Sequence, residues 1–158
     1  MGEQRMLRIL CSASIIIAAL LVQGSSQDAT GGCDTVVRLL ADYPSLAVDR
    51  SEGEVRDYRT GKVGPGCRVE MKGSAAAFRE RGAPDEALRE RFAGLGWSED
   101  YQYTADGPDG SAFAFRRGAS LCVFRAQWDG GDDGDPDYVP DDRYDMEVDC
   151  LVEEPGGG

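Results

Sequence analysis

The chain has 158 residues, no histidine and a formal net charge of −12 at pH 7. This length fits one domain of ordinary size. The lack of histidine excludes Ser-His-Asp and Cys-His catalysis, imidazole metal ligands and histidine general bases. The negative charge argues against nucleic acid and anionic membranes as partners, because their phosphates would repel it, and favours cations or a basic protein.

The N-terminus has the order of a secretory signal peptide. Arg5 and Arg8 precede a mostly apolar run at 9–22, and small polar residues follow at 23–26. The run is shorter than the roughly 20 residues that a membrane span needs. We therefore predict a leader that is cleaved between residues 24 and 29; an uncleaved anchor is the alternative.

This interpretation sets the domain organisation. We predict a signal peptide at 1–27, a single exported α+β domain at 28–154, and a flexible tail at 155–158. No membrane span would remain after removal of the leader, and the mature protein would be secreted or periplasmic. Because the leader carries two arginines and one glutamate, its loss would bring the net charge to about −13.

Residues 34–43 are predicted to form the first helix. Apolar residues recur there at helical spacing, Asp34 is a plausible N-cap, and Pro44 would stop the run. Beyond it, residues 46–48 and 55–58 each favour a short strand, and the glycine-rich stretch 61–66 favours a turn.

Residues 67–72 read as a half-buried strand, because Cys67, Val69 and Met71 alternate with charged residues. A helical turn is predicted at 75–81, and a longer helix is predicted to start at Pro84. The buried stripe of that helix is predicted to be Leu88, Phe92 and Leu95, with Gly96 at its C-terminal cap.

The only basic neighbourhood surrounds this second helix, with arginines at positions 79, 81, 89 and 91. Its simplest interpretation is a solvated helix face supported by Asp85 and Arg89 at i, i+4. The alternative is a docking patch for an acidic partner, or for the acidic loop of the same chain.

Residues 101–152 are predicted to form an antiparallel meander with one apolar face, which the two helices cover. Tyr101 and Tyr103 would share that face, and turns fall at 106–110 and 117–120. The predicted fold is therefore α+β: an antiparallel meander sheet covered by two main helices and holding two disulfides.

The last two strands define their own register. Pairing Trp128 with Tyr144 sets every inward residue of one run against an inward residue of the other, and a slip by one residue would turn the apolar set to water. The predicted pairs are Trp128 with Tyr144, Ala126 with Met146, Phe124 with Val148, and Cys122 with Cys150.

Four cysteines remain after the leader takes Cys11 away, and an even number in an exported chain indicates two disulfides. Four cysteines allow three connectivities. The strand register favours Cys122–Cys150, which leaves Cys33–Cys67. A zinc site is the alternative, although the cysteines lack the close pairs that are typical of structural zinc.

The connection between the last two strands is rich in aspartate. The favoured interpretation is a solvated acidic loop without metal, because charge runs are usually just solvated. The alternative is a weak calcium site, because calcium prefers several hard oxygens on a flexible backbone; its candidate ligands are Asp129, Asp133, Asp135 and Asp137. The stretch is no EF-hand, because Tyr138 and Tyr144 stand where that loop has its glycine and its bidentate glutamate.

Two functions remain open. The first is a non-catalytic binding or interaction domain that works through its acidic loop or a sheet face, with calcium or a basic protein as partner. The second is a carboxylate-dependent hydrolase acting on a polysaccharide, for which Glu99, Asp106 and Asp109 lie near Trp97 in the sequence. An enzyme is the less favoured interpretation, because no nucleophile–base pair or phosphate loop appears.

Overall fold

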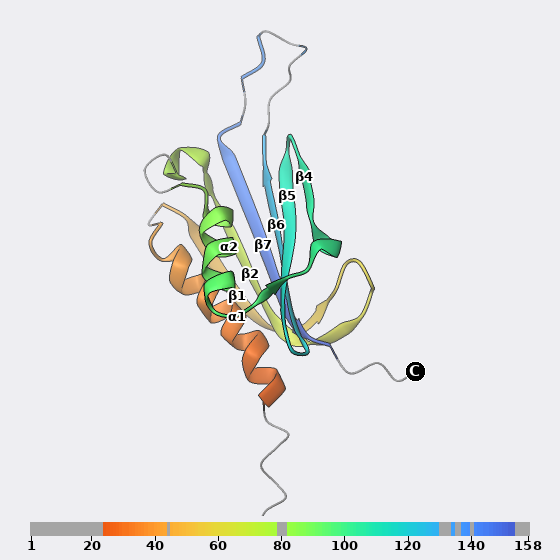
Figure 1. The fold of residues 1–158 in the computed structure, drawn as a ribbon. Helices are drawn as coiled ribbons and strands as arrows, with labels where there is room; N and C mark the ends of the chain where they lie inside the picture. Colours follow the sequence, from red (N-terminus) through yellow and green to blue (C-terminus); the bar gives the residue numbers. More distant parts are fainter. Residues whose placement is uncertain are drawn as a thin grey trace, which may run out of the picture.

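The computed structural model describes residues 24–43, 45–78, 82–129, 134, 137–139 and 141–153. Within these residues, two α-helices pack on one face of a seven-stranded antiparallel sheet (Figure 1). The strand order is β1-β2-β7-β6-β5-β3, and β4 pairs with β5 off this path. The predicted α+β class, with two main helices and two disulfides, is confirmed.

In chain order the elements are α1 (Gly24–Leu40), β1 (Ala47–Arg56), β2 (Val63–Ser74), η1 (Ala75–Phe78), α2 (Pro84–Gly94), β3 (Ser98–Glu99), η2 (Tyr101–Tyr103), β4 (Ala105–Gly107), β5 (Gly110–Arg117), β6 (Ser120–Trp128) and β7 (Arg143–Val152), where η marks a 3-10 helix. None of the described helices is long and apolar enough to cross a membrane. The predicted tail and most of the predicted leader lie outside the described residues.

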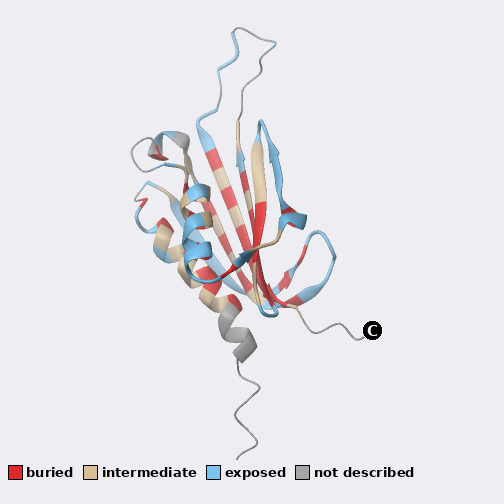
Figure 2. Cartoon of the chain, in the orientation of Figure 1, coloured by how far each residue is buried: buried red, intermediate tan, exposed pale blue. Residues whose placement is uncertain are grey.

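The register predicted for β6 and β7 is confirmed at all four pairs. Trp128 lies opposite Tyr144, and the pairing continues in step to Cys122 opposite Cys150. Buried residues alternate with less buried ones from Arg143 to Val148, and the strand is buried on both sides from there to Val152 (Figure 2). One face of the sheet, called here the helix face, therefore carries the main core.

Helices α1 and α2 cover the helix face, as predicted. Val36 and Leu40 of α1 and Leu88 and Phe92 of α2 are all buried against it. The core also holds a cluster of aromatic rings, in which Phe92 of α2 contacts rings from the sheet. Burial of this apolar area is the main favourable term for the fold.

Helix α1 begins at Gly24, ten residues before the predicted start, so the N-cap role predicted for Asp34 is wrong. The reason is a buried stripe at helical spacing that extends towards the N-terminus through Ala29 and Cys33. Packing of this stripe on the sheet outweighs the low helix propensity of Gly31 and Gly32.

The segment after α1 forms one long hairpin, not the two short strands and glycine turn that were predicted. β1 pairs with β2 along ten residues, and β2 begins at Val63 inside the predicted turn. A Cβ atom at Gly64 or Gly66 would collide with backbone carbonyl oxygens of β7. These glycines therefore permit close approach of two strands, which is one of the uses of glycine inside a sheet.

Helix α2 follows its prediction at both ends. Pro84 occupies the first helical position, and Gly96, at φ +78°, ends the helix in a left-handed conformation. Leu95 is the exception, because it lies at the C-cap and is 40% exposed where burial was predicted. Trp97 packs instead, with its ring centroid 5.2 Å from that of Phe92.

Tyr101 and Tyr103 belong to the short helix η2, so the prediction that both face one side of a strand is wrong. The Asp100 side chain accepts a hydrogen bond from the backbone amide of Gln102 and starts this turn. As a result Tyr103 is buried and Tyr101 is 77% exposed.

A second, smaller core lies on the opposite face of the sheet, called here the open face. It consists of Val55, Tyr103, Ala114, Leu121, Val123 and Leu151. The carboxylate of Asp57 accepts a hydrogen bond of 2.7 Å from the Tyr103 hydroxyl beside it. This core occupies the end of the open face that is remote from the β6–β7 connection, and the other end stays polar.

Candidate functional site

The polar part of the open face is built around four charged side chains. Arg68 of β2, Arg125 of β6, and Glu147 and Asp149 of β7 point to this face because they alternate with the inward residues of their strands. The Asp149 carboxylate receives two hydrogen bonds from Arg68, of 2.7 and 3.0 Å, and one from Arg125, of 2.8 Å. Glu147 pairs with Arg125 and lies 3.5 Å from Arg68.

Asp149 is the centre of this network, because its side chain is only 5% exposed while the two guanidinium groups reach solvent. Hydrogen bonding to Asp149 raises the pKa of Arg68. Burial and the neighbouring Asp149 raise the pKa of Glu147, against the opposing charge of Arg125. The network ties three neighbouring strands together by charge-assisted bonds.

A shallow hollow of about 480 Å³ lies beside the network on the open face. Its lining includes Glu70 and Lys72 of β2, Arg125 and Gln127 of β6, and Asp145 and Glu147 of β7. Charged side chains dominate this lining, so the hollow suits a charged ligand group better than an apolar one.

A second hollow, of about 340 Å³, adjoins the base of the β6–β7 connection. It is lined by Asp109, Gln127, Trp128, Asp129, Asp141 and Arg143. Gln127 lines both hollows, so the two are neighbours. Together the two hollows carry six carboxylates and three cationic groups. We call the six carboxylates the acidic surface; they are Glu70, Asp109, Asp129, Asp141, Asp145 and Glu147.

The four predicted calcium ligands are only partly described. Asp129 accepts hydrogen bonds from the Tyr138 hydroxyl and, at 2.8 Å, from the Asp141 amide. Its carboxylate therefore already helps to close the base of the connection. Asp137 lies in a turn, whereas Asp133 and Asp135 lie outside the described residues.

The carboxylates considered for hydrolysis are scattered. Glu99 pairs with Arg89 at 2.7 Å, and Asp106 lies in the exposed strand β4. Trp97 is buried and packs against Phe92 of α2. Asp109 alone reaches the second hollow, where Trp128 is also found.

The basic neighbourhood around α2 is also divided. Arg89 pairs with Glu99, and its guanidinium carbon lies 3.8 Å from the centroid of the Phe113 ring. Asp85, predicted to support Arg89, instead accepts a hydrogen bond of 3.2 Å from the Tyr144 hydroxyl. Arg91 lines a hollow between α1 and α2, and the arginines at 79 and 81 lie outside the described residues.

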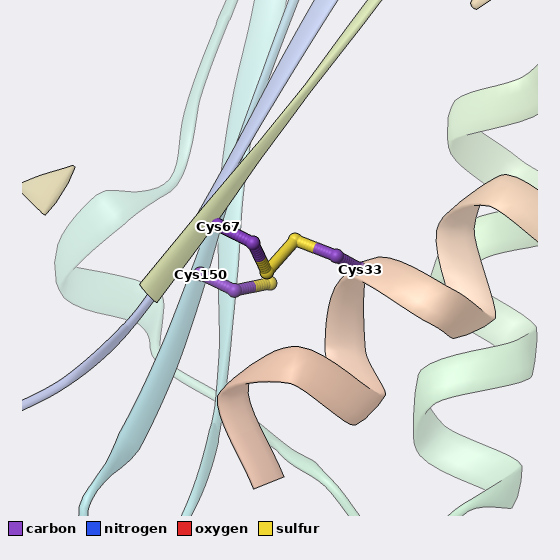
Figure 3. Close-up of side chains that lie close together, drawn as sticks. All are labelled: Cys33, Cys67 and Cys150. Carbon is purple, nitrogen blue, oxygen red and sulfur yellow. A yellow bond between two sulfur atoms is a disulfide. The ribbon is translucent and has the colours of Figure 1, made fainter. Parts of the chain in front are cut away.

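The four cysteines that the structure describes form a compact cluster in the core. The disulfides are Cys33–Cys67, between α1 and β2, and Cys122–Cys150, between β6 and β7. The predicted connectivity is therefore confirmed, and the cysteines form disulfides instead of the alternative zinc site. The sulfur atoms of Cys33, Cys67 and Cys150 all lie within 4.8 Å of one another (Figure 3). The two bridges therefore nearly touch.

Sequence reasoning did not identify the network on the open face. The available signal was the charge at alternate positions: Arg68, Glu70 and Lys72 in one strand, and Asp145, Glu147 and Asp149 in another. Such alternation is common on any half-exposed strand. What makes these residues a site is the placement of β2 directly beside β7, and the predicted meander contained no such pairing.

Comparison of the chain with protein-family models, with curated proteins and with solved structures found no match.

Proposed function

We propose that this protein is an exported binding domain whose acidic surface holds a cationic partner, a basic protein being the class that fits best. The observation that carries the proposal is the pair of adjoining hollows, which bring six carboxylates and three cations together. A partner with lysine or arginine side chains would neutralise the excess negative charge. The net charge of −12 would also speed its approach.

Export of the domain rests on two features. The N-terminal leader has the order of a signal peptide. The two disulfides are of the kind that form and persist in oxidising compartments outside the cytoplasm. A secreted or periplasmic location follows from the proposal.

The test is binding of a fluorescent lysine-rich peptide, measured by anisotropy at low and high salt. The double variant Glu70→Lys/Asp145→Lys reverses two charges of the first hollow. We expect at least about tenfold weaker binding, which corresponds to about 1.4 kcal/mol, and weaker binding of the wild type at high salt.

The matched control is Glu52→Lys/Glu54→Lys, which makes the same change in net charge on the exposed edge strand β1. It should retain most of the affinity. Equal losses in the two double variants would mean that only net charge matters, and the proposed surface would be rejected.

A calcium ion at the same end of the sheet is a second candidate ligand. Asp109, Asp129 and Asp141 line one hollow there, and carboxylate oxygens are preferred calcium ligands. We expect a higher melting temperature in millimolar calcium than in EDTA, and loss of this difference in Asp129→Asn. An unchanged melting temperature in the wild type would rule out the ion.

The alternative activity is hydrolysis of a polysaccharide. It is supported by Trp128, Asp109 and Asp129 around that same hollow, since an aromatic ring can stack on a sugar and paired carboxylates can act as acid and base. Release of reducing sugar from a panel of polysaccharides, lost in Asp109→Asn, would favour the enzyme over the binding domain.

A further inference from the structure

The three cysteines on the sheet form a row across three neighbouring strands. Cys150 of β7 lies opposite Cys67 of β2 on one side and opposite Cys122 of β6 on the other. Residues directly opposite each other in an antiparallel sheet have Cα atoms about 4.5–5.5 Å apart. A disulfide spans about 4.4–6.8 Å, so Cys150 has two neighbours at bonding range.

Cys33 reaches this row from above, because α1 crosses β2, β6 and β7 on the helix face. Its sulfur lies within 4.8 Å of the sulfurs of both Cys67 and Cys150 (Figure 3). All four cysteines in the described part of the chain are fully buried. A thiolate released at Cys67 would therefore have the Cys150 sulfur as a close target, within 4.8 Å.

We infer that the two disulfides form one exchange unit, that is, a pair of bridges between which thiol–disulfide exchange can occur. In this exchange the Cys33–Cys67 bond breaks, and the Cys67 sulfur then bonds to the Cys150 sulfur. The exchange would release α1 from its only disulfide to the sheet among the described residues, while β2 and β7 become linked. An external thiol would therefore change how α1 is held on the sheet.

The chemistry balances without net oxidation or reduction. The Cys33 sulfur is buried in the closed fold, so the first step is a local opening of α1 that uncovers it. A small thiolate, such as one of the glutathione class, then attacks the Cys33 sulfur, and Cys67 leaves as a thiolate with the electron pair. The Cys67 sulfur then attacks Cys150, the Cys122–Cys150 bond breaks, and Cys122 leaves as a thiolate that takes a proton. The products are a mixed disulfide at Cys33, a Cys67–Cys150 bridge and a free thiol at Cys122.

The first test is the variant Cys33→Ser, which frees Cys67 directly. In protein without the predicted leader, and so without Cys11, trypsin places the three remaining cysteines on separate peptides, 63–68, 118–125 and 144–158. The linked pair can then be read by non-reducing mass spectrometry after alkylation. We expect peptide 63–68 to be linked to 144–158 and peptide 118–125 to be alkylated. The native 118–125 link to 144–158, with 63–68 alkylated, would overturn the inference.

The matched control is Cys33→Ser/Cys67→Ser, which loses the same bridge to α1 but has no attacking thiol. It should retain the native link between 118–125 and 144–158. If the control also lost that link, general scrambling and not exchange through Cys67 would explain the first result.

A second measurement uses the wild-type protein and so does not depend on the folding of a variant. The protein is incubated with a small amount of glutathione, quenched with N-ethylmaleimide and digested. We expect the 63–68 link to 144–158, together with faster hydrogen exchange of the α1 amides than of the β7 amides. Only native links and fully reduced peptides would reject the exchange unit.

Discussion

Trp128 and Tyr144 face each other at the last pair of β6 and β7, with ring centroids 5.9 Å apart and ring planes within 6° of parallel. This stack closes the strand pair where the acidic connection leaves the sheet. We predict that Trp128→Ala lowers the free energy of unfolding by about 2 kcal/mol, because stacked area is lost at a partly exposed position. Trp128→Phe should retain about half of this energy in urea denaturation. If Trp128→Phe lost as much free energy of unfolding as Trp128→Ala, stacking of an aromatic ring on Tyr144 would contribute nothing to stability.

Gly31 and Gly32 are adjacent in α1, but replacing each of them by alanine should have opposite effects on stability. A Cβ at Gly31 meets no atom within 4 Å, whereas one at Gly32 would lie 2.9 Å from the Cys150 sulfur and closer to that of Cys122. Gly31→Ala should therefore stabilise the helix by about 0.5–1 kcal/mol. Gly32→Ala should destabilise the protein by about 2 kcal/mol through overpacking. Thermal unfolding of both variants tests whether α1 packs directly on the disulfide sulfurs at Gly32. A higher melting temperature of Gly32→Ala would contradict this packing.

Asp149 holds two arginines on the open face, so its removal leaves both without their shared acceptor. We predict that Asp149→Ala costs about 3 kcal/mol in the free energy of unfolding. Glu70→Ala is the matched control, because its exposed pair with Lys72, at 3.9 Å, should contribute less than about 0.5 kcal/mol. Similar effects of the two substitutions in guanidinium denaturation would mean that the network does not stabilise the fold.

Asp57 should make the free energy of unfolding depend on pH in the acidic range. Burial tends to raise its pKa, but hydrogen bonds from the side chains of Thr60 and Tyr103 and from backbone amides outweigh it and hold the pKa below the usual 3.8. A carboxyl group whose pKa is lower in the folded protein than in the unfolded chain stabilises the fold at pH values above the unfolded pKa. This stabilisation is lost as the pH falls through the folded pKa.

The corresponding experiment compares unfolding of the wild type and of Asp57→Asn between pH 7 and pH 2. The variant should be less stable at pH 7 by about 2 kcal/mol, through loss of hydrogen bonds to a charged acceptor. The difference should shrink as the pH falls below 3.8. A difference that stays constant down to pH 2 would contradict the lowered pKa.

The parts of the fold that could be predicted are those in which local pattern and packing agree. Cys122 and Cys150 share a register that period-two alternation alone defines, and their disulfide follows from it. The start of α2 at Pro84 and its end at Gly96 likewise follow from backbone preferences of single residues.

The parts that could not be predicted depend on contacts between distant segments. Gly64 and Gly66 resemble a turn in the sequence, and only the close approach of β7 makes them strand residues. The early start of α1 reflects burial of Ala29 on a sheet that forms far along the chain. The second core did leave a signal, since the continuous apolar run at 121–124 is typical of a strand buried on both faces.

The candidate site was located in part. The second hollow lies at the base of the predicted acidic connection and includes Asp129. The first hollow depends on Glu70 of β2 lying beside Glu147 of β7, a pairing that no local pattern specifies. Charge alternation identified the exposed sides of both strands without indicating that they are neighbours.

The most direct test of the proposed binding function is a nuclear magnetic resonance titration of the labelled protein with a lysine-rich peptide. The account predicts that amide shifts concentrate at Asp109 and in the segments 70–72, 125–129 and 141–147, which contain the other residues that line the two hollows. The amides of α1 and α2 should move little. Shifts that concentrate on the helices, or that spread evenly over every acidic residue of the chain, would contradict a binding role for the acidic surface.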